Sequence, residues 1–317
     1  MAIASKHADQ AKPGAKYDRL IAAAKAIPAA ATIVVHPCDE SSLRGVADAA
    51  EAGIIKPILV GPSAKIKAVA SKHGIDIGGF ELIDVSHSEA AAAKAVELIH
   101  AARGEMLMKG SLHTDELMRS VTAKAGGLRT ERRISHVFVM DVPTYHKVLI
   151  VTDGAINIAP TLEDKVDICQ NAIDLALALG LEKPKIAILA AVETVTSKMP
   201  ATIDAAALCK MAERGQITGA LLDGPLAFDN AISKRAAETK GIRSDVAGDP
   251  DILLAPDLEA GNILAKQLSF LANADSAGLV LGARVPIILT SRADSVRSRI
   301  ASCGVAMLAA HARRKKP

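Results

Sequence analysis

The sequence predicts an α/β fold in which mostly parallel sheets are flanked by helices and divided between two subdomains. Short apolar runs rich in β-branched residues alternate with alanine-rich segments of helix length, which is the pattern of βαβ units. The apolar runs are continuous and do not alternate with polar residues, as expected for strands that helices cover on both faces. These runs are too numerous for one ordinary sheet, so two subdomains are expected.

The strands and helices can be placed from these runs and from the residues at their ends. Asp39 or Ser41 can cap the first expected helix, and Gly180, Gly215 and Gly241 lie where glycines commonly end helices. The expected strands are Thr32–Val35, Pro57–Val60, Glu81–Asp84, His136–Met140, Val148–Thr152, Lys185–Leu189, Gly219–Leu222, Ile252–Leu254, Leu279–Leu281 and Pro286–Leu289. The expected helices are Ser41–Ala52, Ser88–Arg103, Thr114–Lys124, Leu162–Leu179, Thr202–Arg214, Leu226–Thr239 and Leu258–Leu271.

The chain is expected to cross between the subdomains twice. The segment Asp141–Lys147 joins two apolar runs, and its Pro143 would interrupt a strand or a helix. A second crossing is expected near Ala274–Gly278, after which the chain returns to the first subdomain. The predicted subdomains are residues 1–145 with 278–317, and residues 146–277.

The composition argues against several classes of protein. The net charge of the 317-residue chain is only +3, aromatic residues make up 2%, and Trp is absent, so neither a basic surface nor a stacking platform for nucleic acid is expected. No apolar run reaches the ~18 residues needed to span a bilayer, and residues 1–16 lack the apolar core of a signal peptide. We therefore expect no nucleic-acid partner and no membrane partner.

The residues that commonly bind metals are scattered. Glu193, Asp223 and Asp257 show no metal-ligand spacing, and each is more often a helix cap or the partner of a basic side chain. A zinc site or a disulfide framework is not expected, and a reducing cytoplasm fits the cysteine usage. The cysteines form no C-x-x-C pair and lie far apart, at Cys38, Cys169, Cys209 and Cys303.

Polar residues gather directly after the expected strands. In open parallel sheets, ligands bind beyond the carboxyl ends of the strands, so these residues are candidates for a site. They are His36–Glu40 with Arg44, Asp153–Asn157, Glu193, Asp223–Pro225, Asp257 with Asn262 and Lys266, and Thr290–Ser295.

The cluster after the last expected strand contains Ser291, Arg292 and Asp294. The strand Val285–Leu289 leads through this cluster into a helix, whose N-terminus offers unpaired N–H groups and a positive dipole end to an anion. Arg292 can bind two phosphate oxygens with its planar guanidinium group. The alternative is that Asp294 or Ser295 only caps the helix and Arg292 is a surface residue.

A second pattern suited to an anion is the segment Lys109–Thr114. Gly110 permits close approach of the backbone, and Thr114 can cap the next helix. The segment is neither a P-loop nor a G-x-G-x-x-G motif, so the alternative is an ordinary loop with a cap. His113 could act as an acid, a base or a phosphate ligand, or could be merely structural.

Several segments together give the chain a resemblance to the phosphate acetyltransferase and phosphate butyryltransferase family, from about residue 39 to about residue 310. Each segment alone is a weak signal, but their joint order and spacing are specific. The segments are Met108–Thr114, Gly126–Arg129, Ser135–Val137, Thr152–Asn157 with Pro160, Asp223–Asp229, Lys240–Ile242 with Ser244, Gly261–Asn262 with Lys266, and Thr290–Arg292.

The resemblance implies a fold similar to that of isocitrate and isopropylmalate dehydrogenases, an active site in the cleft between the subdomains, and a homodimer. The implied reaction is acyl-CoA plus phosphate giving acyl phosphate plus CoA, with no tightly bound cofactor and no metal. By the same resemblance, the CoA thiolate attacks directly in a ternary complex. Such a site must deprotonate the thiol, hold the phosphate and stabilise an oxyanion.

The resemblance also implies roles for individual residues. Ser291 and Arg292 match the catalytic pair of the family, in which Arg292 would hold the phosphate and Ser291 would orient the thiol or stabilise the developing charge. The matching substrate-binding positions are Lys109, Gly110, His113, Thr114, Asn157, Asp223, Gly224, Pro225, Asn262 and Lys266.

The sequence departs from the acetyltransferase pattern at the base. In acetyltransferases the proposed base is an Asp seven residues after the catalytic Ser, and this chain has Ser298 there. Asp294, three residues after Ser291, is instead typical of the butyryltransferase-like branch. We therefore expect Asp294 to be the third catalytic residue, and an acyl group other than acetyl or a broad short-chain range.

Two alternatives keep the scaffold but change the function. One is a phosphate acyltransferase that takes long chains from acyl carrier protein, which would need an apolar tunnel and a basic docking patch. The other is a non-catalytic acyl-CoA sensor, which could lose Ser291 and Arg292 without losing the fold. The presence of both residues favours an enzyme.

Overall fold

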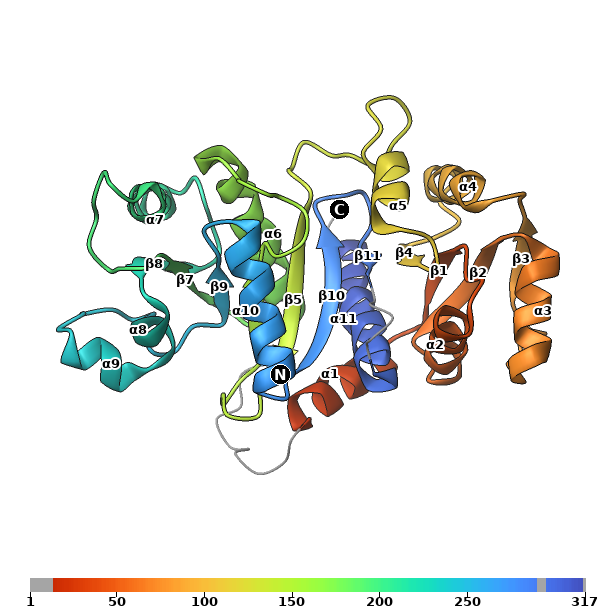
Figure 1. The fold of residues 1–317 in the computed structure, drawn as a ribbon, viewed down its shortest axis with the longest axis horizontal. Coiled ribbons are helices and arrows are strands. Elements are labelled where there is room, and N and C mark those ends of the chain that lie inside the picture. The colour runs from red at the N-terminus through yellow and green to blue at the C-terminus, as the bar shows by residue number, and fades with distance from the viewer. Residues whose placement is uncertain (1–13, 290–294, 316–317) are drawn as a thin grey trace. The chain divides into compact units, whose positions relative to one another are not determined.

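The computed structural model of the chain describes residues 14–289 and 295–315 (Figure 1). The chain forms two compact units, each of which draws on separate stretches of sequence. Unit 1 consists of Met1–Lys16 and Arg133–Ser276, and unit 2 of Tyr17–Arg132 and Ala277–Pro317.

The first boundary between the units precedes the position expected from the sequence. Residues 133–145 belong to unit 1 because β5 (Ser135–Asp141) pairs with β6 (Leu149–Thr152) as an antiparallel neighbour. Ladder hydrogen bonds between the two strands keep this hairpin in one unit. Pro143 lies in the connection of the hairpin, and the chain crosses between units before β5.

Unit 2 contains a mostly parallel sheet with the strand order β3-β2-β1-β4-β11-β10, in which only the pair of β10 with β11 is antiparallel among the pairs described. The strands are β1 (Ala30–Val35), β2 (Ile55–Gly61), β3 (Glu81–Asp84), β4 (Met106–Lys109), β10 (Asp275–Leu281) and β11 (Ile287–Ile288). The helices are α1 (Ala15–Lys25), α2 (Glu40–Glu51), α3 (Ser63–His73), α4 (Ser88–His100), α5 (Thr114–Val121) and α11 (Val296–Arg314).

Unit 1 contains a second group of strands in the order β5-β6-β9-β7-β8, parallel except for the β5–β6 pair. Its further strands are β7 (Lys185–Leu189), β8 (Leu221–Leu226) and β9 (Ile252–Leu254). Its helices are α6 (Leu162–Ala178), α7 (Pro200–Glu213), α8 (Phe228–Ile232), α9 (Lys234–Thr239) and α10 (Leu258–Leu271).

Helix α11 is buried along most of its length in unit 2, where it contacts α2, β4 and β11. Helix α11 also lies against α1, since a Cβ atom on Gly304 would lie 3.4 Å from the Cβ of Ala24, an ordinary van der Waals distance. The helix begins at a defined residue, since the Ser295 side chain accepts a hydrogen bond from the N–H of Ser298. The cluster of candidate residues that precedes α11 in the sequence is thus followed by a buried helix with a defined first residue.

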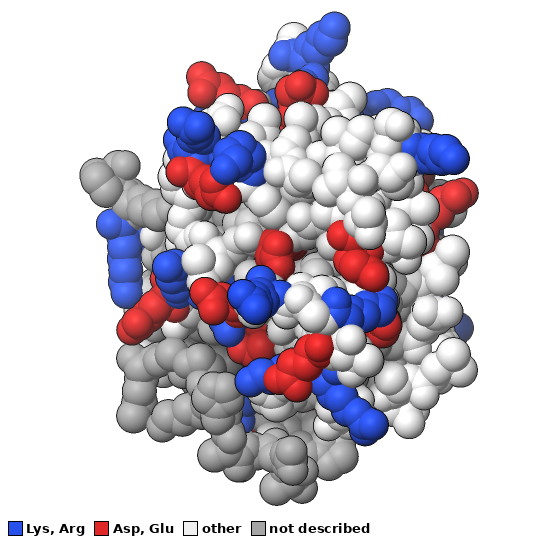
Figure 2. All heavy atoms as spheres, turned by 90° about the vertical axis from the view of Figure 1, so that its left-hand side faces the viewer, with Lys and Arg blue, Asp and Glu red and all other residues white. Residues whose placement is uncertain are grey.

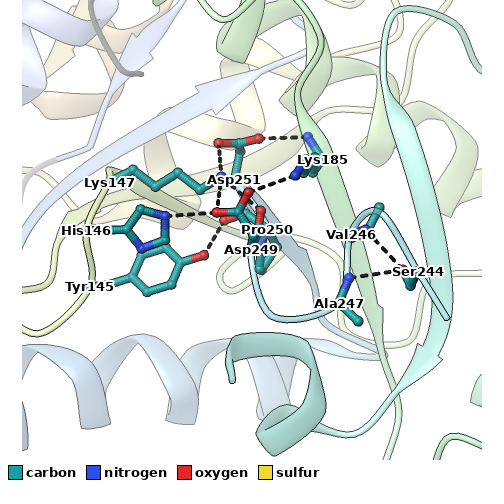
Figure 3. A network of polar contacts seen from close by, with 10 residues as sticks. All are labelled: Tyr145, His146, Lys147, Lys185, Ser244, Val246, Ala247, Asp249, Pro250 and Asp251. Carbon is teal, nitrogen blue, oxygen red and sulfur yellow. Dashed lines mark hydrogen bonds and ion pairs between the residues drawn. The ribbon is translucent and has the colours of Figure 1, made fainter. Parts of the chain in front are cut away.

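A polar network lies at the amino-terminal ends of the parallel strands β6, β7 and β9 in unit 1 (Figure 3). Asp249 accepts hydrogen bonds from His146 (2.8 Å) and Lys185 (2.7 Å) and forms an ion pair with Lys147 (2.9 Å). Asp251 pairs with the same Lys147 at 2.9 Å and accepts the backbone N–H of Lys185 at 2.8 Å. Burial raises the pKa of Asp249, but the bonds from Lys185 and Lys147 outweigh it and hold that pKa well below its usual range.

The sequence placed most elements correctly. The strands Glu81–Asp84, Lys185–Leu189 and Ile252–Leu254 have the predicted bounds, as does the helix Leu258–Leu271. The expected helix over 226–239 is wrong as a single element, because Ser233 adopts an extended conformation between α8 and α9 and caps α9. The strands β10 and β8 are longer than predicted, and β4, α1 and α3 had not been assigned.

Figure 2 views the molecule from the side of unit 1, where basic and acidic side chains are interspersed and do not gather into a field of one sign. This mixture agrees with a net charge of only +3. Among the helices of residues 14–289 and 295–315, none is long and apolar enough to cross a membrane.

Candidate functional site

Several of the candidate residues that the structure describes lie close together within each unit, near edges where parallel strands end. In unit 2, β1, β4 and β11 run parallel, with Val35 opposite Lys109 and Met108 opposite Ile288. The carboxyl ends of these strands therefore meet at one edge, which is where ligands bind in open α/β sheets.

Gly110 brings the loop after β4 into direct contact with the loop after β1. Its N–H donates to the carbonyl of Val35 at 2.8 Å, and the N–H of Ser111 donates to the carbonyl of His36 at 2.9 Å. A Cβ atom on Gly110 would lie 2.4 Å from the Val35 oxygen and 2.5 Å from the His36 oxygen. This position therefore excludes any side chain, and the close approach expected of Gly110 is made to protein backbone.

Ser111 and His36 bond to each other across this junction, although 75 residues separate them. The Ser111 Oγ lies 3.1 Å from His36 Nδ1 and 2.8 Å from the His36 carbonyl oxygen, and it accepts the N–H of Cys38 at 3.2 Å. His36 has a left-handed backbone with φ of 54°. His36 follows an expected strand, but no local pattern in the sequence marks His36 or Ser111 for a role.

Lys109, His113 and Thr114 surround the same loop. The Nζ atom of Lys109 donates to the carbonyls of Gly110 and Leu112, both at 3.1 Å, so this side chain also holds the loop. His113 and Thr114 are exposed at the start of α5. Helix α5 begins at Thr114 and its N-cap position is His113, so the expectation that Thr114 is the cap is wrong.

The expected catalytic residues Ser291, Arg292 and Asp294 lie outside the residues that the structure describes. Their flanks are described: the chain leaves β11 beside β4, and Ser295 caps α11. Of the two residues considered as the cap, Ser295 holds that position.

Ser298 occupies the position of the family's Asp and lies in the first turn of α11. It is 6% exposed, and its hydroxyl lies 3.2 Å from the Ser295 hydroxyl, while its backbone N–H donates to the same Ser295 oxygen. Ser298 is therefore part of the helix start.

The cluster in unit 1 centres on Asp153, a buried carboxylate after β6. Its two oxygens accept the backbone N–H groups of Ala155 (2.9 Å), Ile156 (3.1 Å) and Asn157 (3.2 Å), and also the side-chain amide of Asn157. Asp153 is 2% exposed. A single acid thus fixes the whole turn 153–157.

Asn157 is also buried, and its amide group is fully used within the protein. Its nitrogen donates to the carbonyl of Ile134 at 2.9 Å and to Asp153, and its oxygen accepts Arg133 Nε at 2.7 Å. The side chain of Arg133 is half exposed and also lies 3.4 Å from Asp164. The structure thus gives Asn157 the position of a residue that orients Arg133.

His136 lies on β5, which pairs with β6, and is buried with 3% of its surface exposed. Burial lowers its pKa to about 4, against the opposing charge of Asp153, so the ring is neutral near pH 7. Among the residues that the structure describes, its Nδ1 has no hydrogen-bond partner, and its ring lies edge-on to Phe138.

Asn262 and Lys266 lie on α10, one turn apart. The Asn262 amide donates to the carbonyl of Gly154 at 2.9 Å, and Lys266 is exposed. A Cβ atom on Gly261 would lie 2.3 Å from the Asp153 carbonyl oxygen, so the start of α10 is in contact with the turn 153–157.

The segment Asp223-Gly224-Pro225 does not follow β8, as expected from the sequence, but lies inside it. The register with β7 shifts between Ala187 and Leu189, which lets β8 continue through Pro225 to Leu226. The Asp223 side chain accepts the N–H of Gly224 at 2.9 Å.

Glu193, beyond the end of β7, belongs to an ion network whose members are too far apart in the sequence to be recognised from it. It accepts hydrogen bonds from Lys240 at 3.1 Å and from the buried Asn230 at 3.2 Å, and Lys240 also contacts Asp229. The hydrogen bond from Lys240 lowers the pKa of Glu193. Glu193 is thus the partner of a basic side chain, which was the alternative considered for it. In the part of the chain that the structure describes, no group of three or more His, Cys, Asp or Glu side chains could hold a metal ion.

Comparisons with known proteins agree with the resemblance inferred from the sequence. A family model described as "Phosphate acetyl/butaryl transferase" matches residues 88–309. A phosphate acetyltransferase of Rhizobium meliloti is 69% identical over 94% of this chain and 95% of its own length. A phosphate butyryltransferase of Clostridium acetobutylicum is 43% identical over 86% of this chain and 90% of its own length.

Solved structures agree with the fold. A branched-chain phosphotransacylase from Enterococcus faecalis V583 has a TM-score of 0.77 and 29% identity, covering 89% of this chain and 99% of its own. A 4-hydroxythreonine-4-phosphate dehydrogenase from Klebsiella pneumoniae has a TM-score of 0.54 and 14% identity, covering 90% of this chain and 98% of its own. The second likeness concerns the fold alone and confirms the dehydrogenase-like architecture.

Proposed function

The chain belongs to the phosphate acetyl/butyryl transferase family, whose members transfer an acyl group reversibly between CoA and phosphate, and we propose that it acts on short-chain acyl groups by direct thiolate attack in a ternary complex. The observation that carries this proposal is the edge of unit 2 where β4 and β11 end side by side. One strand leads into Lys109 and Gly110 and the other into Ser291 and Arg292. The parallel pairing of β4 with β11 thus supports the proposal that the residues following these two strands bind the same anion.

We propose the following division of labour among these residues. Arg292 holds the phosphate and Ser291 orients the thiol, as the family resemblance implies. Lys109 and His113 lie on the phosphate side, where an ammonium and an imidazole can contact the anion. Asp294 is the third catalytic residue, because Ser298 is engaged in the start of α11.

The acyl range is the first property to test. The relative at 69% identity is named an acetyltransferase and the relative at 43% a butyryltransferase, and the Asp294 pattern is typical of the second branch. We expect acetyl-, propionyl- and butyryl-CoA all to be used, with kcat/KM values for chains that differ by one methylene within about 10–200-fold of each other, since one methylene is worth only ~1–3 kcal/mol in an apolar pocket.

Thiol release from each acyl-CoA in the presence of phosphate measures this range. A strict preference for acetyl-CoA would contradict the argument from Asp294. Absence of thiol release from all three would contradict the proposed function. If the protein then used acyl groups carried on acyl carrier protein, the result would favour an enzyme that depends on that carrier. If it used neither kind of donor, the result would favour the acyl-CoA sensor.

The remaining proposals concern what the protein needs in order to work. We propose a cytoplasmic homodimer that uses acyl-CoA and inorganic phosphate and holds no tightly bound cofactor or metal. Exhaustive chelation followed by dialysis should leave kcat unchanged, because Arg292 and Lys109 can supply the positive charge. Activity lost on chelation and restored by one divalent metal, but not by others, would refute this.

A further inference from the structure

His36 presents a ring nitrogen at the edge of unit 2 that the proposed roles leave unused. It directly follows β1 and lies beside Ser111 in the loop that Gly110 fixes. His36 as a residue is only partly buried. Within residues 14–289 and 295–315, its Nε2 atom has no hydrogen-bond partner, whereas its Nδ1 atom faces Ser111.

The contacts of Ser111 determine which nitrogen of His36 carries the proton. The Ser111 hydroxyl oxygen lies 2.8 Å from the His36 carbonyl oxygen, and two oxygens at this distance need a proton between them. The single hydroxyl proton of Ser111 is therefore used, and the 3.1 Å contact with Nδ1 can form only if Nδ1 donates. A neutral His36 then carries its proton on Nδ1 and a lone pair on Nε2.

The backbone around His36 fixes the ring in this orientation. Ser111 also accepts the N–H of Cys38 at 3.2 Å, so its hydroxyl makes one donated and two accepted bonds. The left-handed φ of His36, 54°, is unusual for a residue with a side chain. These contacts are all within one unit and hold the two loops together.

We propose that His36 is a further substrate-contacting residue, whose Nε2 accepts the proton of hydrogen phosphate as that phosphate attacks the acyl-CoA. This inference rests on the proposed function. A phosphate oxygen forms the new C–O bond, the C–S bond breaks, and its electron pair leaves with the sulfur of CoA. The phosphate O–H proton passes to Nε2, which later releases it to water.

The charges around His36 suit this task. Burial and the charge of Lys65 on α3 lower the pKa of His36 below its usual 6.5, while Glu116 on α5 and Asp39 before α2 oppose this shift. The neutral form, which alone can accept a proton, is thus the main form above pH 6.5. Activity in the direction of acyl phosphate should fall on the acid side, below pH 6.5, as His36 becomes protonated.

The variant His36→Asn separates the proton acceptor from the structure of the loop. The Asn side-chain amide can still donate to Ser111 from a position close to that of Nδ1, and Asn tolerates a left-handed φ. It offers no base in place of Nε2. We expect kcat/KM for phosphate to fall by ~10²–10⁴-fold, with the acidic limb of its pH profile lost and the melting temperature and the KM for acyl-CoA unchanged.

The matched control is His87→Asn in the same unit. His87 is exposed and caps α4 by accepting the N–H of Ala90, a role that Asn performs equally well. Its kinetics and pH profile should equal those of the wild type. A His36→Asn enzyme with wild-type kcat/KM, or one with reduced activity but an unchanged acidic limb, would overturn the inference.

A second variant decides the question if His36→Asn does not fold. His36→Gly removes the ring at a position where a positive φ favours glycine, and added imidazole should then restore phosphate-dependent thiol release in a saturable way. No restoration would overturn the role of His36. A wild type without thiol release from acetyl-, propionyl- or butyryl-CoA overturns the proposed function together with this inference, whereas an active wild type with an unaffected His36→Asn overturns this inference alone.

Discussion

Replacing Asp294 with Asn is expected to lower kcat by ~10²–10⁴-fold in the direction in which CoA attacks acyl phosphate, the range typical of lost acid–base assistance. Asn retains the size and the capping ability of Asp, so a residue that served only as a helix cap would tolerate this change. The structure places Ser295 at the N-cap of α11, so the helix does not need Asp294 for that function. A thiol also needs help to lose its proton at neutral pH.

The test is kcat across pH for the wild type and for Asp294→Asn, with acetyl and butyryl phosphate as substrates. Asp18→Asn is the matched control, because Asp18 forms an exposed ion pair at 2.8 Å with Arg297 in the first turn of the same helix. Loss of this surface pair should leave kcat unchanged. An Asp294→Asn enzyme as fast as the wild type at every pH would remove Asp294 from the mechanism.

Replacing Asp153 with Asn is expected to cause the largest loss of stability. The buried carboxylate accepts four hydrogen bonds, and an Asn in its place would direct an NH₂ group at some of these donors. Hydrogen bonds to charged groups contribute ~1.5–3 kcal/mol each, so losing two lowers the free energy of unfolding by at least about 3 kcal/mol. For a unit of this size, the melting temperature should fall by about 6–12 °C.

Asp257→Asn provides the control for this measurement. Asp257 caps α10 through the N–H of Ala260 at 2.8 Å, and Asn caps about as well as Asp. Thermal unfolding of the two variants should therefore differ clearly, with Asp257→Asn close to the wild type. If the Asp153→Asn and Asp257→Asn variants had the same melting temperature, the turn 153–157 would not depend on the charge of Asp153.

The elements that the sequence placed correctly are those with unambiguous local patterns. The strand Lys185–Leu189 is apolar and β-branched, and α10 starts after a capping Asp257. The strand β4, Met106-Leu-Met-Lys109, has no β-branched residue and was not assigned. It is a strand because it pairs with β1 on one side and β11 on the other, which local propensity does not reveal.

The same limit applies to the candidate site. The motifs around Lys109 and Asn157 were visible as short segments, but the contact between Ser111 and His36 joins residues 75 positions apart. Only the parallel register of β1 with β4 brings them together. The contacts of the buried Asn157 likewise depend on Arg133 and Ile134, which lie just before β5.

The division of unit 2 between the two ends of the chain has a consequence for protein synthesis. Arg133–Ser276 leaves the ribosome as one continuous stretch, whereas Tyr17–Arg132 emerges first and Ala277–Pro317 last. Until the last stretch appears, β4 lacks its neighbour β11 and α2 lacks α11, so apolar surface of the first-made part of unit 2 remains uncovered. Unit 1 can therefore assemble before residues 277–317 have been made, whereas unit 2 is completed only after they emerge. A nascent chain halted at Ser276 would be a target for chaperones through its N-terminal part.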